Sequence, residues 1–417
     1  MNDTPADGIR IMFQDLSVLF GADVGSPGFI ADPYARASPA LAEGPVRRLP
    51  GGTVAALGHR AAARVLRDPR FGHGATTLYG TTLAGVRARS FMQLDPPGHA
   101  RLRGQVATRF APHRIAAMES TLSARVRALV RERAGRDIDF VTDFAEPLAM
   151  SVISDFLGIP EPDRHQFHHD SRLVVRGLDD AAHPAADPAI GQARYRFMRY
   201  FRKLAERRRH TPQGDLVSTM VHSGGASTGE LLTTCGLVMS AGYETTVDLL
   251  SSAVLELARL PEGAGWRMAE EPQKRQAMVE EVLRLHPPVM GTARSALTGA
   301  DVDGAEVEKG TTVAVLLAAA NRDPHVYEQP HAFLPDRYLG PAGSGSKDAP
   351  PRHLSFGGGP HFCLGAALAR LEADIVLSAL APCRPQLTGE WSYKDSLSVR
   401  GLRRLPVRWR ARPPAGP

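Results

Sequence analysis

The stretch FGGGPHFCLG at residues 356–365 decides the fold, because it forms a tight glycine-rich loop that leads into a helix. The three glycines at 357–359 lack Cβ atoms and let the backbone approach a flat object closely. Pro360 stiffens the end of the loop. Strong helix formers follow Cys363, so this residue is predicted to lie at a helix N-terminus, where amide N–H groups favour a thiolate. A thiolate on such a platform is suited to bind a metal that a planar cofactor carries.

The spacing Phe-x-x-Gly-x-x-x-Cys-x-Gly, filled by Phe356, Gly359, Cys363 and Gly365, resembles the haem-binding loop of the cytochrome P450 monooxygenases. In that family the cysteine thiolate is the axial ligand of the haem iron. The resemblance therefore implies haem b as the cofactor and Cys363 as the metal ligand. The alternative is a structural cysteine beside a glycine-rich turn, which is the usual environment of a lone cysteine. The four matching positions and further motifs upstream favour haem.

The composition indicates a large globular protein with its own core. The chain has 417 residues, of which 43% are hydrophobic, and no apolar run reaches the ~18 residues of a membrane-spanning helix. No linker divides it, so a single domain over residues 1–417 is expected. The N-terminus lacks the basic and apolar regions of a signal peptide. Three cysteines do not form a disulfide framework, so a reducing, cytoplasmic setting is expected.

The positive charge is spread along the chain. The net charge is +6 and the pI is about 9.4, which favours steering of an acidic partner. The densest basic stretch, 194–210, has apolar residues at helical spacing and is typical of a solvated helix face. Neither nucleic acid nor a membrane is expected as a partner. His165, His168 and His169 lie close together, but no cysteine or second ligand pair flanks them, so a metal site there is disfavoured.

A second motif begins at Asp95, where Asp-Pro-Pro predicts a helix start with the aspartate as N-cap. His99 and Arg103 are four residues apart and share one face of this helix. Alone they would be two surface charges. The pattern Asp-Pro-Pro-x-His-x-x-x-Arg is similar to the P450 helix that binds the haem propionates, so the resemblance gives both residues that role. Arginine suits it because its planar guanidinium binds carboxylates bidentately.

A long helix is predicted from Ser227 to about Leu260. Ser227 and Glu230 form a capping box at its start, and Pro261 stops it. The helix would be ~50 Å long at 1.5 Å per residue. Its centre, AGYETT at 241–246, places a glycine beside two threonines, which weakens a helix. Such a weakened centre is where a function is expected.

The sequence AGYETT also resembles the oxygen-activation motif of the P450s, Ala/Gly-Gly-x-Asp/Glu-Thr-Thr. The resemblance implies that Ala241 and Gly242 let dioxygen on the haem approach the helix. Thr245 would hydrogen-bond this oxygen, and Glu244 would relay protons from solvent, so these two are the expected catalytic residues. The motif argues for an active oxygenase and against a catalytically silent protein that only binds haem or recruits a partner.

Two further groups of residues follow from the same resemblance. Their spacing alone places Glu281 and Arg284 on the same side of a helix. As an exposed ion pair they would stabilise the fold by well under ~1 kcal/mol. In P450s this pair joins a later arginine in a buried network that supports the haem loop, and Arg337 stands at the matching place. Arg294 and His361 match further positions that bind the propionates.

The substrate pocket is expected from alignment by spacing. Residues 71–93 and 173–190 are expected to be pocket loops, and residues 1–50 to be irregular. Residues 397–401 are expected to form a hairpin tip that points into the pocket. The expected pocket residues are Leu237, Ser240, Ala241, Met290, Thr292 and Leu397.

The resemblance covers about residues 50–405 and implies a mainly α triangular prism with a long central helix over the haem and a small β region. The implied activity is insertion of one oxygen atom from O2 into a hydrophobic small molecule, by C–H hydroxylation or epoxidation, in tailoring a secondary metabolite such as a polyketide, macrolide, peptide or terpenoid. Oxidative coupling or rearrangement is the alternative. The substrate is free or bound to a carrier protein, and a monomer is expected.

Electrons are expected to come from NAD(P)H through a reductase and a ferredoxin. An acidic ferredoxin would dock on the face beneath Cys363 by charge complementarity. The basic residues expected there are Arg101, Arg109, Arg114 and Arg370.

Overall fold

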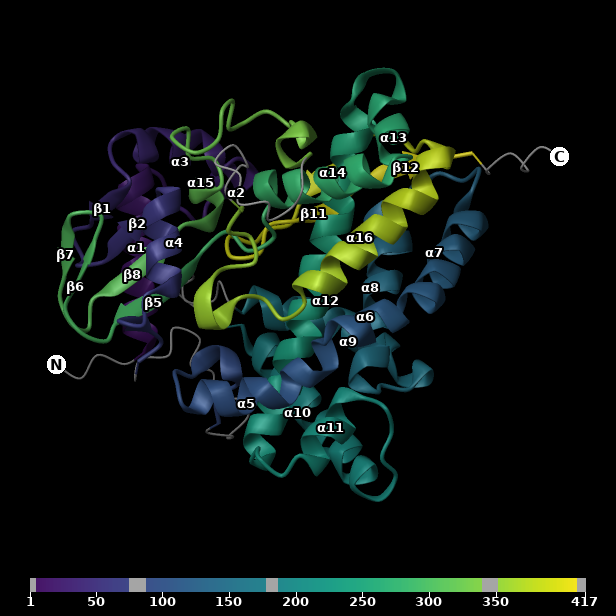
Figure 1. Ribbon diagram of the computed structural model, residues 1–417, viewed down its shortest axis with the longest axis horizontal. Coiled ribbons are helices and arrows are strands. Elements are labelled where there is room, and N and C mark those ends of the chain that lie inside the picture. Colours follow the sequence, from purple (N-terminus) through teal and green to yellow (C-terminus); the bar gives the residue numbers. More distant parts are fainter. Residues whose placement is uncertain (1–4, 75–87, 178–186, 340–351, 411–417) are drawn as a thin grey trace.

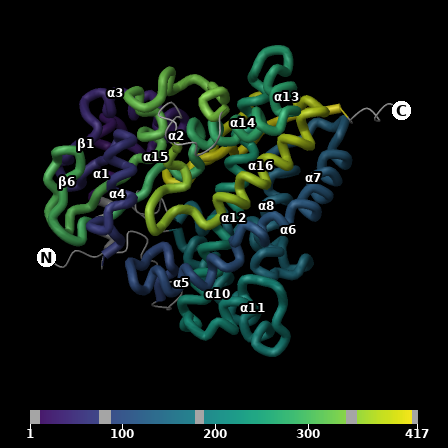
Figure 2. The backbone as a smooth tube through the Cα atoms, viewed as in Figure 1, coloured from purple at the N-terminus to yellow at the C-terminus, as the bar shows by residue number. Residues whose placement is uncertain are grey.

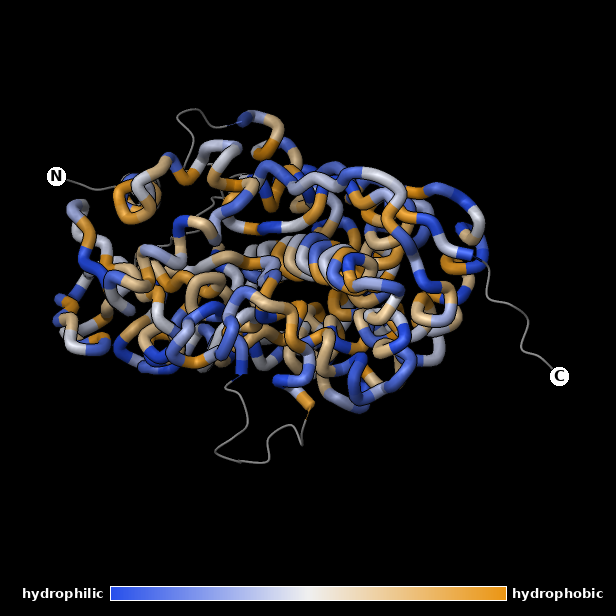
Figure 3. Tube along the Cα trace, turned by 90° about the horizontal axis from the view of Figure 1, so that it is seen from above, coloured by the Kyte–Doolittle hydropathy of each residue, from blue (hydrophilic) through white to orange (hydrophobic). Residues whose placement is uncertain are grey.

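The computed structural model describes residues 5–74, 88–177, 187–339 and 352–410 (Figure 1). Helices form most of it, and most of the strands gather with the N-terminal helices at one side of the molecule (Figures 1 and 2). Hydrophilic segments recur around the outline, and hydrophobic segments run through the interior (Figure 3). Among the described residues, no helix is long and apolar enough to cross a membrane.

The helices occupy nearly every part of the chain. Their bounds are α1 Pro5–Phe20, α2 Pro27–Ala31, α3 Tyr34–Ala42, α4 His59–Arg67, α5 Gly98–Ala107, α6 Pro112–Ala117, α7 Glu119–Arg133, α8 Glu146–Leu157, α9 His165–Arg176, α10 Pro188–His210, α11 Leu216–His222, α12 Thr228–Arg259, α13 Ala264–Ala269, α14 Pro272–Leu285, α15 Leu317–Ala320 and α16 Ala366–Leu380.

The largest sheet has the strand order β1-β2-β8-β5-β3, and three small sheets accompany it. Strand β2 pairs in parallel with β8, and the other neighbours in this sheet are antiparallel. The strand bounds are β1 Val46–Arg48, β2 Val54–Ala56, β3 Phe71–Gly72, β4 Ile138–Asp139, β5 Thr292–Ala296, β6 Ala300–Val302, β7 Ala305–Val307, β8 Thr312–Val315, β9 Gln386–Leu387, β10 Ser392–Tyr393, β11 Leu402–Arg404 and β12 Pro406–Arg408.

The prediction that residues 1–50 are irregular is wrong, because α1, α2, α3 and β1 lie there. Pro27 and Pro33 mark helix starts in this region, since proline is well suited to the first helical position. Ser26 caps α2, and its Oγ accepts the N–H of Phe29 at 3.4 Å. Phe13 of α1 and Phe29 of α2 are buried in one apolar cluster with Ala314 of β8. Burial of apolar side chains thus stabilises helices in a region where the turn residues predicted irregular structure.

The predicted central helix is present as α12, and its capping box forms as expected. Ser227 Oγ accepts the N–H of Glu230 at 3.2 Å, and Glu230 Oε2 accepts the N–H of Ser227 at 2.8 Å. Helices α8, α9, α10, α14 and α16 pack around α12. Most of its residues are therefore buried, as in any helix that neighbours surround.

The two predicted pocket loops lie partly outside the described residues, which leave out 75–87 and 178–186. The part of 173–190 that the structure describes is mostly helical, because α9 extends to Arg176 and α10 begins at Pro188. The expected hairpin near the C-terminus is formed by β10 and β11, where Tyr393 pairs with Leu402. Residues 397–401 lie in the connection between these strands, as predicted.

Candidate active site

The glycine-rich loop packs between α4 and α16. Cys363 N donates to Phe356 O at 2.9 Å, which closes the loop. Gly359 has φ +63°, and a Cβ at this position would lie 2.3 Å from Leu66 O of α4, so no other residue fits without a shift. Helix α16 begins at Ala366, so Cys363 lies near a helix N-terminus, as predicted. Gly365 is its N-cap residue.

The sulfur of Cys363 faces the start of α16. The N–H groups of Gly365 and Ala366 donate to it, as the predicted thiolate requires. Burial raises the pKa of the Cys363 thiol, and these N–H groups together with Arg103 and Arg370 lower it by less. Residue 363 keeps exposed surface even though protein atoms crowd around the sulfur, so a ligand can reach it. The side chain of Phe356, at the start of the loop, lies 4.6 Å from the Arg370 guanidinium, in a cation–π contact.

Beside this loop lies a cluster of basic side chains from separate elements. The His361 ring lies 4.2 Å from the His99 ring of α5 and 4.8 Å from the His73 ring, measured between centroids. Burial and, to a smaller extent, the neighbouring His73, Arg294, His99 and Arg103 together lower the pKa of His361 to about 2. Burial and Arg294 likewise outweigh the opposing effect of Asp95 and lower the pKa of His73 to about 4. The structure thus brings together the four residues predicted to bind propionates.

His73 is a member of this basic cluster that the sequence did not reveal. Asp95, predicted to cap α5, instead accepts the backbone N–H groups of His73 and Gly74 at 2.7–3.1 Å. Pro97 is the N-cap residue of α5. Asp95 therefore fixes the end of β3 against the start of α5 and sets the His73 ring beside His361. Of the residues in this contact, only Asp95 had a structural role predicted from the sequence.

The arrangement fits haem on three observations. The Cys363 sulfur is held by two N–H groups and remains reachable. The buried Nε2 atoms of His73 and His99 make no hydrogen bond within the described residues, which suits a site for carboxylates. Ala241 is exposed in the middle of an otherwise buried helix. Arg103 Nη2 donates to Phe362 O at 2.5 Å, and Arg294 Nη1 donates to Ala293 O at 2.8 Å, so both guanidinium groups are oriented by the backbone.

The structure adds packing constraints at the centre of α12. A Cβ on Gly242 would lie 2.5 Å from Ile153 Cδ1, so the glycine also allows close packing against α8. Glu244, the expected proton relay, is only 3% exposed. Thr245 Oγ1 donates to Ala241 O at 2.6 Å, a bond back to the helix that threonine commonly makes.

Glu244 takes part in a buried group of charges that we call the acid–lysine triad, formed by Glu244, Asp248 and Lys394. Lys394 Nζ donates to Glu244 Oε2 and to Asp248 Oδ1, both at 2.6 Å. Asp248 lies four residues after Glu244, on the same helix face, which is the one signal the sequence offered. Lys394 lies on the β10–β11 connection, so only the tertiary structure brings it to α12.

The three residues of the predicted buried network meet one another. Arg284 donates to Glu281 through Nε and Nη2 at 2.8 Å, and Arg337 Nε donates to Glu281 Oε1 at 3.3 Å. The remaining guanidinium N–H groups of Arg284 donate to backbone carbonyls of Asn321, Pro330 and Ala332. The side chains of Glu281 and Arg284 are fully buried.

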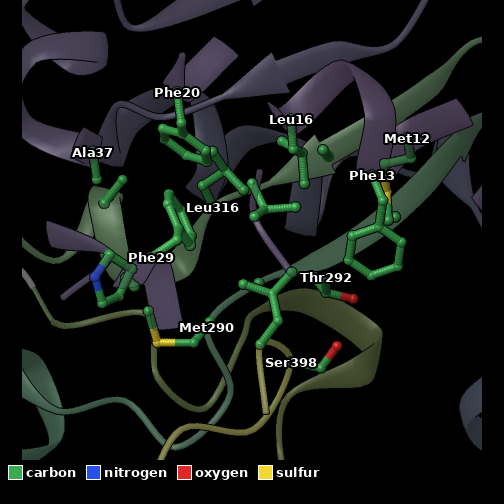
Figure 4. A pocket seen from close by; sticks show the side chains of 18 of the residues that line it. Met12, Phe13, Leu16, Phe20, Phe29, Ala37, Met290, Thr292, Leu316 and Ser398 are labelled. Atoms are coloured by element: carbon green, nitrogen blue, oxygen red, sulfur yellow. The ribbon is translucent and has the colours of Figure 1, made fainter. Parts of the chain in front are cut away.

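The expected pocket residues divide into two groups. Met290, Thr292 and Leu397 line an apolar cavity of about 100 Å³ (Figure 4). Its other walls come from the N-terminal helices, through residues such as Phe13 and Phe29, which the sequence did not predict. The remaining expected residues, Leu237, Ser240 and Ala241, lie on α12 and do not line this cavity.

The histidines at 165, 168 and 169, for which a metal site was disfavoured, lie on α9. Among them, His168 Nδ1 lies 3.4 Å from the Tyr243 hydroxyl.

The chain resembles proteins of one family over almost its whole length. The family described as "Cytochrome P450" matches residues 190–380. The monooxygenase PikC of Streptomyces venezuelae, a cytochrome P450, is 35% identical over 419 residues, covering 94% of this chain and 95% of that protein. A cytochrome P450 named for polyketide biosynthesis, PksS of Bacillus subtilis (strain 168), is 33% identical over 324 residues, covering 75% of this chain and 76% of that protein.

Solved structures agree with the predicted fold. The structure titled P450BioI, in complex with an acyl carrier protein that carries hexadec-9Z-enoic acid, superposes with a TM-score of 0.80 at 30% identity. The alignment covers 92% of this chain and all of that one (100%). The predicted fold, mainly helical with a long central helix and a small β region, is confirmed.

Proposed function

This chain belongs to the cytochrome P450 family and is a monooxygenase, and from that premise we propose its substrate class, its redox partners and the roles of its site residues. Haem b is its cofactor. When bound to a cysteine thiolate, haem activates O2, so that one oxygen atom enters the substrate and the other leaves as water. The residues of this chain must hold that group, exclude bulk water, position the substrate and deliver protons.

Cys363 is the proposed metal ligand, supported by its reachable sulfur and the two N–H groups that donate to it. Gly359 lets the loop turn against α4, and Phe356 packs against Arg370. Gly365 is proposed to bind the cofactor with the loop, and a Cβ at this position would lie 3.8 Å from the Cys363 sulfur. Replacing Cys363 by alanine should abolish the visible spectrum of thiolate-bound haem, while a persisting thiolate-type spectrum would contradict the assignment. The proposed propionate-binding residues are His99, Arg103, Arg294 and His361, with His73 as an addition.

Thr245 and Glu244 are the proposed proton-delivering residues. The Thr245 hydroxyl lies on the same turn of α12 as the exposed Ala241, and the carboxyl group of Glu244 is held one residue earlier. In Thr245→Ala we expect O2 to be consumed with less product and more hydrogen peroxide, because a proton donor is lost. Unchanged coupling of NAD(P)H oxidation to product would show that Thr245 is not in the relay.

The proposed substrate is a hydrophobic, acyl-type natural product such as a polyketide. The observation that carries this proposal is the apolar cavity where Met290, Thr292 and Leu397 meet the N-terminal helices (Figure 4). The relative named for polyketide biosynthesis and the structure with an acyl-loaded carrier protein support it. Leu237, Ser240 and Ala241 would contact the part of the substrate nearer to α12.

A spectral titration of the ferric protein tests the substrate class. Free long-chain fatty acids and macrolides would be compared with the same acyl chains on an acyl carrier protein. A shift from low to high spin with any of these supports the proposal, and a shift only with the carrier-bound chains assigns presentation by a carrier. A shift with compact terpenoids alone would contradict an acyl-type substrate.

Two alternatives make different predictions about the products. Oxidative coupling or rearrangement would consume O2 and NAD(P)H without adding oxygen to the product, which mass spectrometry with ¹⁸O2 distinguishes from hydroxylation or epoxidation. A catalytically silent haem protein would not couple NAD(P)H oxidation to product formation. The intact Cys363, Glu244 and Thr245 argue against the catalytically silent protein.

The proposed electron donor is an acidic ferredoxin, itself reduced by a reductase that uses NAD(P)H. Of the four arginines expected at the docking face, Arg114 is exposed, whereas Arg101 pairs with Glu230 and Arg370 with Glu280. Arg109 donates to Gly214 O. Arg114→Glu should therefore slow reduction by ferredoxin and weaken the dependence of its rate on salt, since exposed charges steer association. Rates identical to those of the natural chain would contradict this docking face. We also propose that the protein is a monomer and that it lies in the cytoplasm. The three free cysteines support the cytoplasmic setting.

A further inference from the structure

The acid–lysine triad has more carboxylate than cation. Glu244 and Asp248 share the single ammonium group of Lys394, and both of their side chains are almost completely buried, with 4% and 1% exposed surface. Glu244 Oε1 and Asp248 Oδ2 are buried and make no hydrogen bond within the described residues. A buried ionised oxygen without a partner is costly. A single proton shared between the two carboxyl groups would remove the excess negative charge.

The groups that face the triad favour such a proton. Glu146 at the start of α8 adds negative charge near Asp248, and its partner Arg172 of α9 lies within electrostatic range of Glu244. Burial, together with Glu244 and Glu146, outweighs the opposing effect of Lys394 and raises the pKa of Asp248 to about 7. Burial alone would lower the pKa of Lys394, but the two carboxylates outweigh it and raise that pKa, so the lysine stays charged. The uncharged neighbours are Tyr243 and His168, which contact each other beside Glu146.

The β10–β11 hairpin is built to seat Lys394 on α12. Lys394 N donates to Gly401 O at 2.9 Å across the hairpin. A Cβ on Gly401 would lie only 1.7 Å from Asp248 Oδ1, so the hairpin can approach the helix this closely only with a glycine at 401. The lysine side chain keeps 18% of its surface exposed, which makes it the member of the triad closest to solvent.

We propose that the acid–lysine triad stores a proton for the monooxygenase reaction, with Asp248 as an additional proton-holding group and Lys394 as the positioning residue for both carboxylates. The proposal rests on the proposed roles of Glu244 and Thr245. Each turnover needs two protons with the two electrons that the ferredoxin supplies, so that O2 yields one inserted oxygen atom and one water molecule. The triad gives one proton through Glu244 toward Thr245, becomes an anion, and is reprotonated from the solvent side at Lys394.

A readout independent of catalysis tests whether the proton is present. Infrared difference spectra of the ferric holoenzyme, recorded between pH 5.5 and pH 8.5, should contain the carbonyl band of a protonated carboxyl group that titrates near neutral pH. Asp248→Asn removes this group while keeping an oxygen for Lys394 to contact, so the band should disappear. Glu244→Gln should remove it as well, because the remaining Asp248 carboxylate is then neutralised by Lys394. A band unchanged in both variants, or absent from the natural chain, would overturn the proposal.

A second readout tests whether this proton is used. NADPH oxidation by the complete ferredoxin system without added substrate divides O2 between hydrogen peroxide and water, and only the path to water needs the further protons. Asp248→Asn should raise the peroxide fraction severalfold and change the solvent deuterium isotope effect on that fraction. An altered infrared band with an unchanged peroxide fraction would overturn the use of the proton in the reaction, whereas Thr245→Ala tests the proposed function itself.

Asp215→Asn is a matched control. Asp215 is an equally buried carboxylate with a cationic partner, Arg208, at 2.6 Å. Asp215 caps α11, and asparagine keeps this cap, although the charge of the buried pair with Arg208 is lost. The variant is therefore first compared with the natural chain by its haem spectrum. Its infrared band near neutral pH and its peroxide fraction should match those of the natural chain. Equal changes in Asp215→Asn and Asp248→Asn would mean that any buried carboxylate has this effect, and would also overturn the proposal.

Discussion

Two buried ion clusters, one formed by Glu281, Arg284 and Arg337 and one on α12, both combine carboxylates with basic side chains and differ in how completely their hydrogen bonds are satisfied. In the Glu281–Arg284–Arg337 network, the Glu281 carboxylate receives two arginines and the backbone N–H of Leu334. In the acid–lysine triad, one oxygen of each carboxylate lacks a partner within the described residues. A buried carboxylate whose oxygens all accept hydrogen bonds is stabilised in its ionised form. A buried carboxylate oxygen without a partner favours uptake of a proton. The difference indicates that the first supports the fold and the second handles protons.

The strongest test of this comparison is to break the satisfied network. Glu281→Gln leaves two buried guanidinium groups without a negative partner, and removing one partner of a buried ion pair costs about 3–5 kcal/mol. We expect a loss of that size in the free energy of unfolding, measured by chemical denaturation, together with reduced haem content. Asp248→Asn should cost clearly less, since the triad already carries excess negative charge. Equal losses would remove the distinction between the two clusters.

A smaller effect is expected where the hairpin meets α12. Gly401→Ala forces a methyl group onto the Asp248 carboxylate, and such overpacking costs about 1–3 kcal/mol. The variant should also shift the titration of the triad, because Lys394 moves with the hairpin. Thermal unfolding and the infrared titration measure the two effects.

Gly191→Ala provides the control for this substitution. No atom lies within 4 Å of a Cβ at Gly191 in α10, so alanine should be neutral or stabilise the helix by about 0.5–1 kcal/mol. If Gly401→Ala were as well tolerated as Gly191→Ala, the hairpin would not be seated as closely on α12 as the structure has it.

The smallest effect is confined to acid pH and concerns Glu280, next to the satisfied network. Burial raises its pKa, but the hydrogen bonds from Arg370 and His353 outweigh burial and lower it to about 2 from the ordinary 4.5. A carboxyl group with a lowered pKa in the folded state stabilises the fold above its unfolded pKa, and this contribution is lost as pH falls from about 4.5 to 2. Glu280→Gln should make stability less dependent on pH in that window, measured by denaturation at several pH values. An unchanged dependence would assign the acid sensitivity to other groups.

The sequence allowed prediction of the elements whose signals are local. The capping box of Ser227 and Glu230 located α12, because both hydrogen bonds form within one turn. The glycines and Cys363 predicted the loop and a helix start close to Cys363, and α16 begins at Ala366. The N-terminal helices were missed, since proline marks both turns and helix starts and only burial against β8 decides between them. The packing of Gly242 against Ile153 was not predicted, because Ile153 comes from a helix distant in the sequence.

By itself, the sequence determined the family, the haem cofactor and the position of the long central helix, because these depend on motifs whose residues lie within a few positions of one another. Only the tertiary structure decided that Lys394 and Asp248 surround Glu244, that His73 joins His361, and that the N-terminal helices enclose the apolar cavity. Lys394 lies 150 residues from Glu244 along the chain, and no local pattern records such a distance. Burial then decides the charge of these groups, since the electrostatic environment of a side chain is set by everything that packs around it.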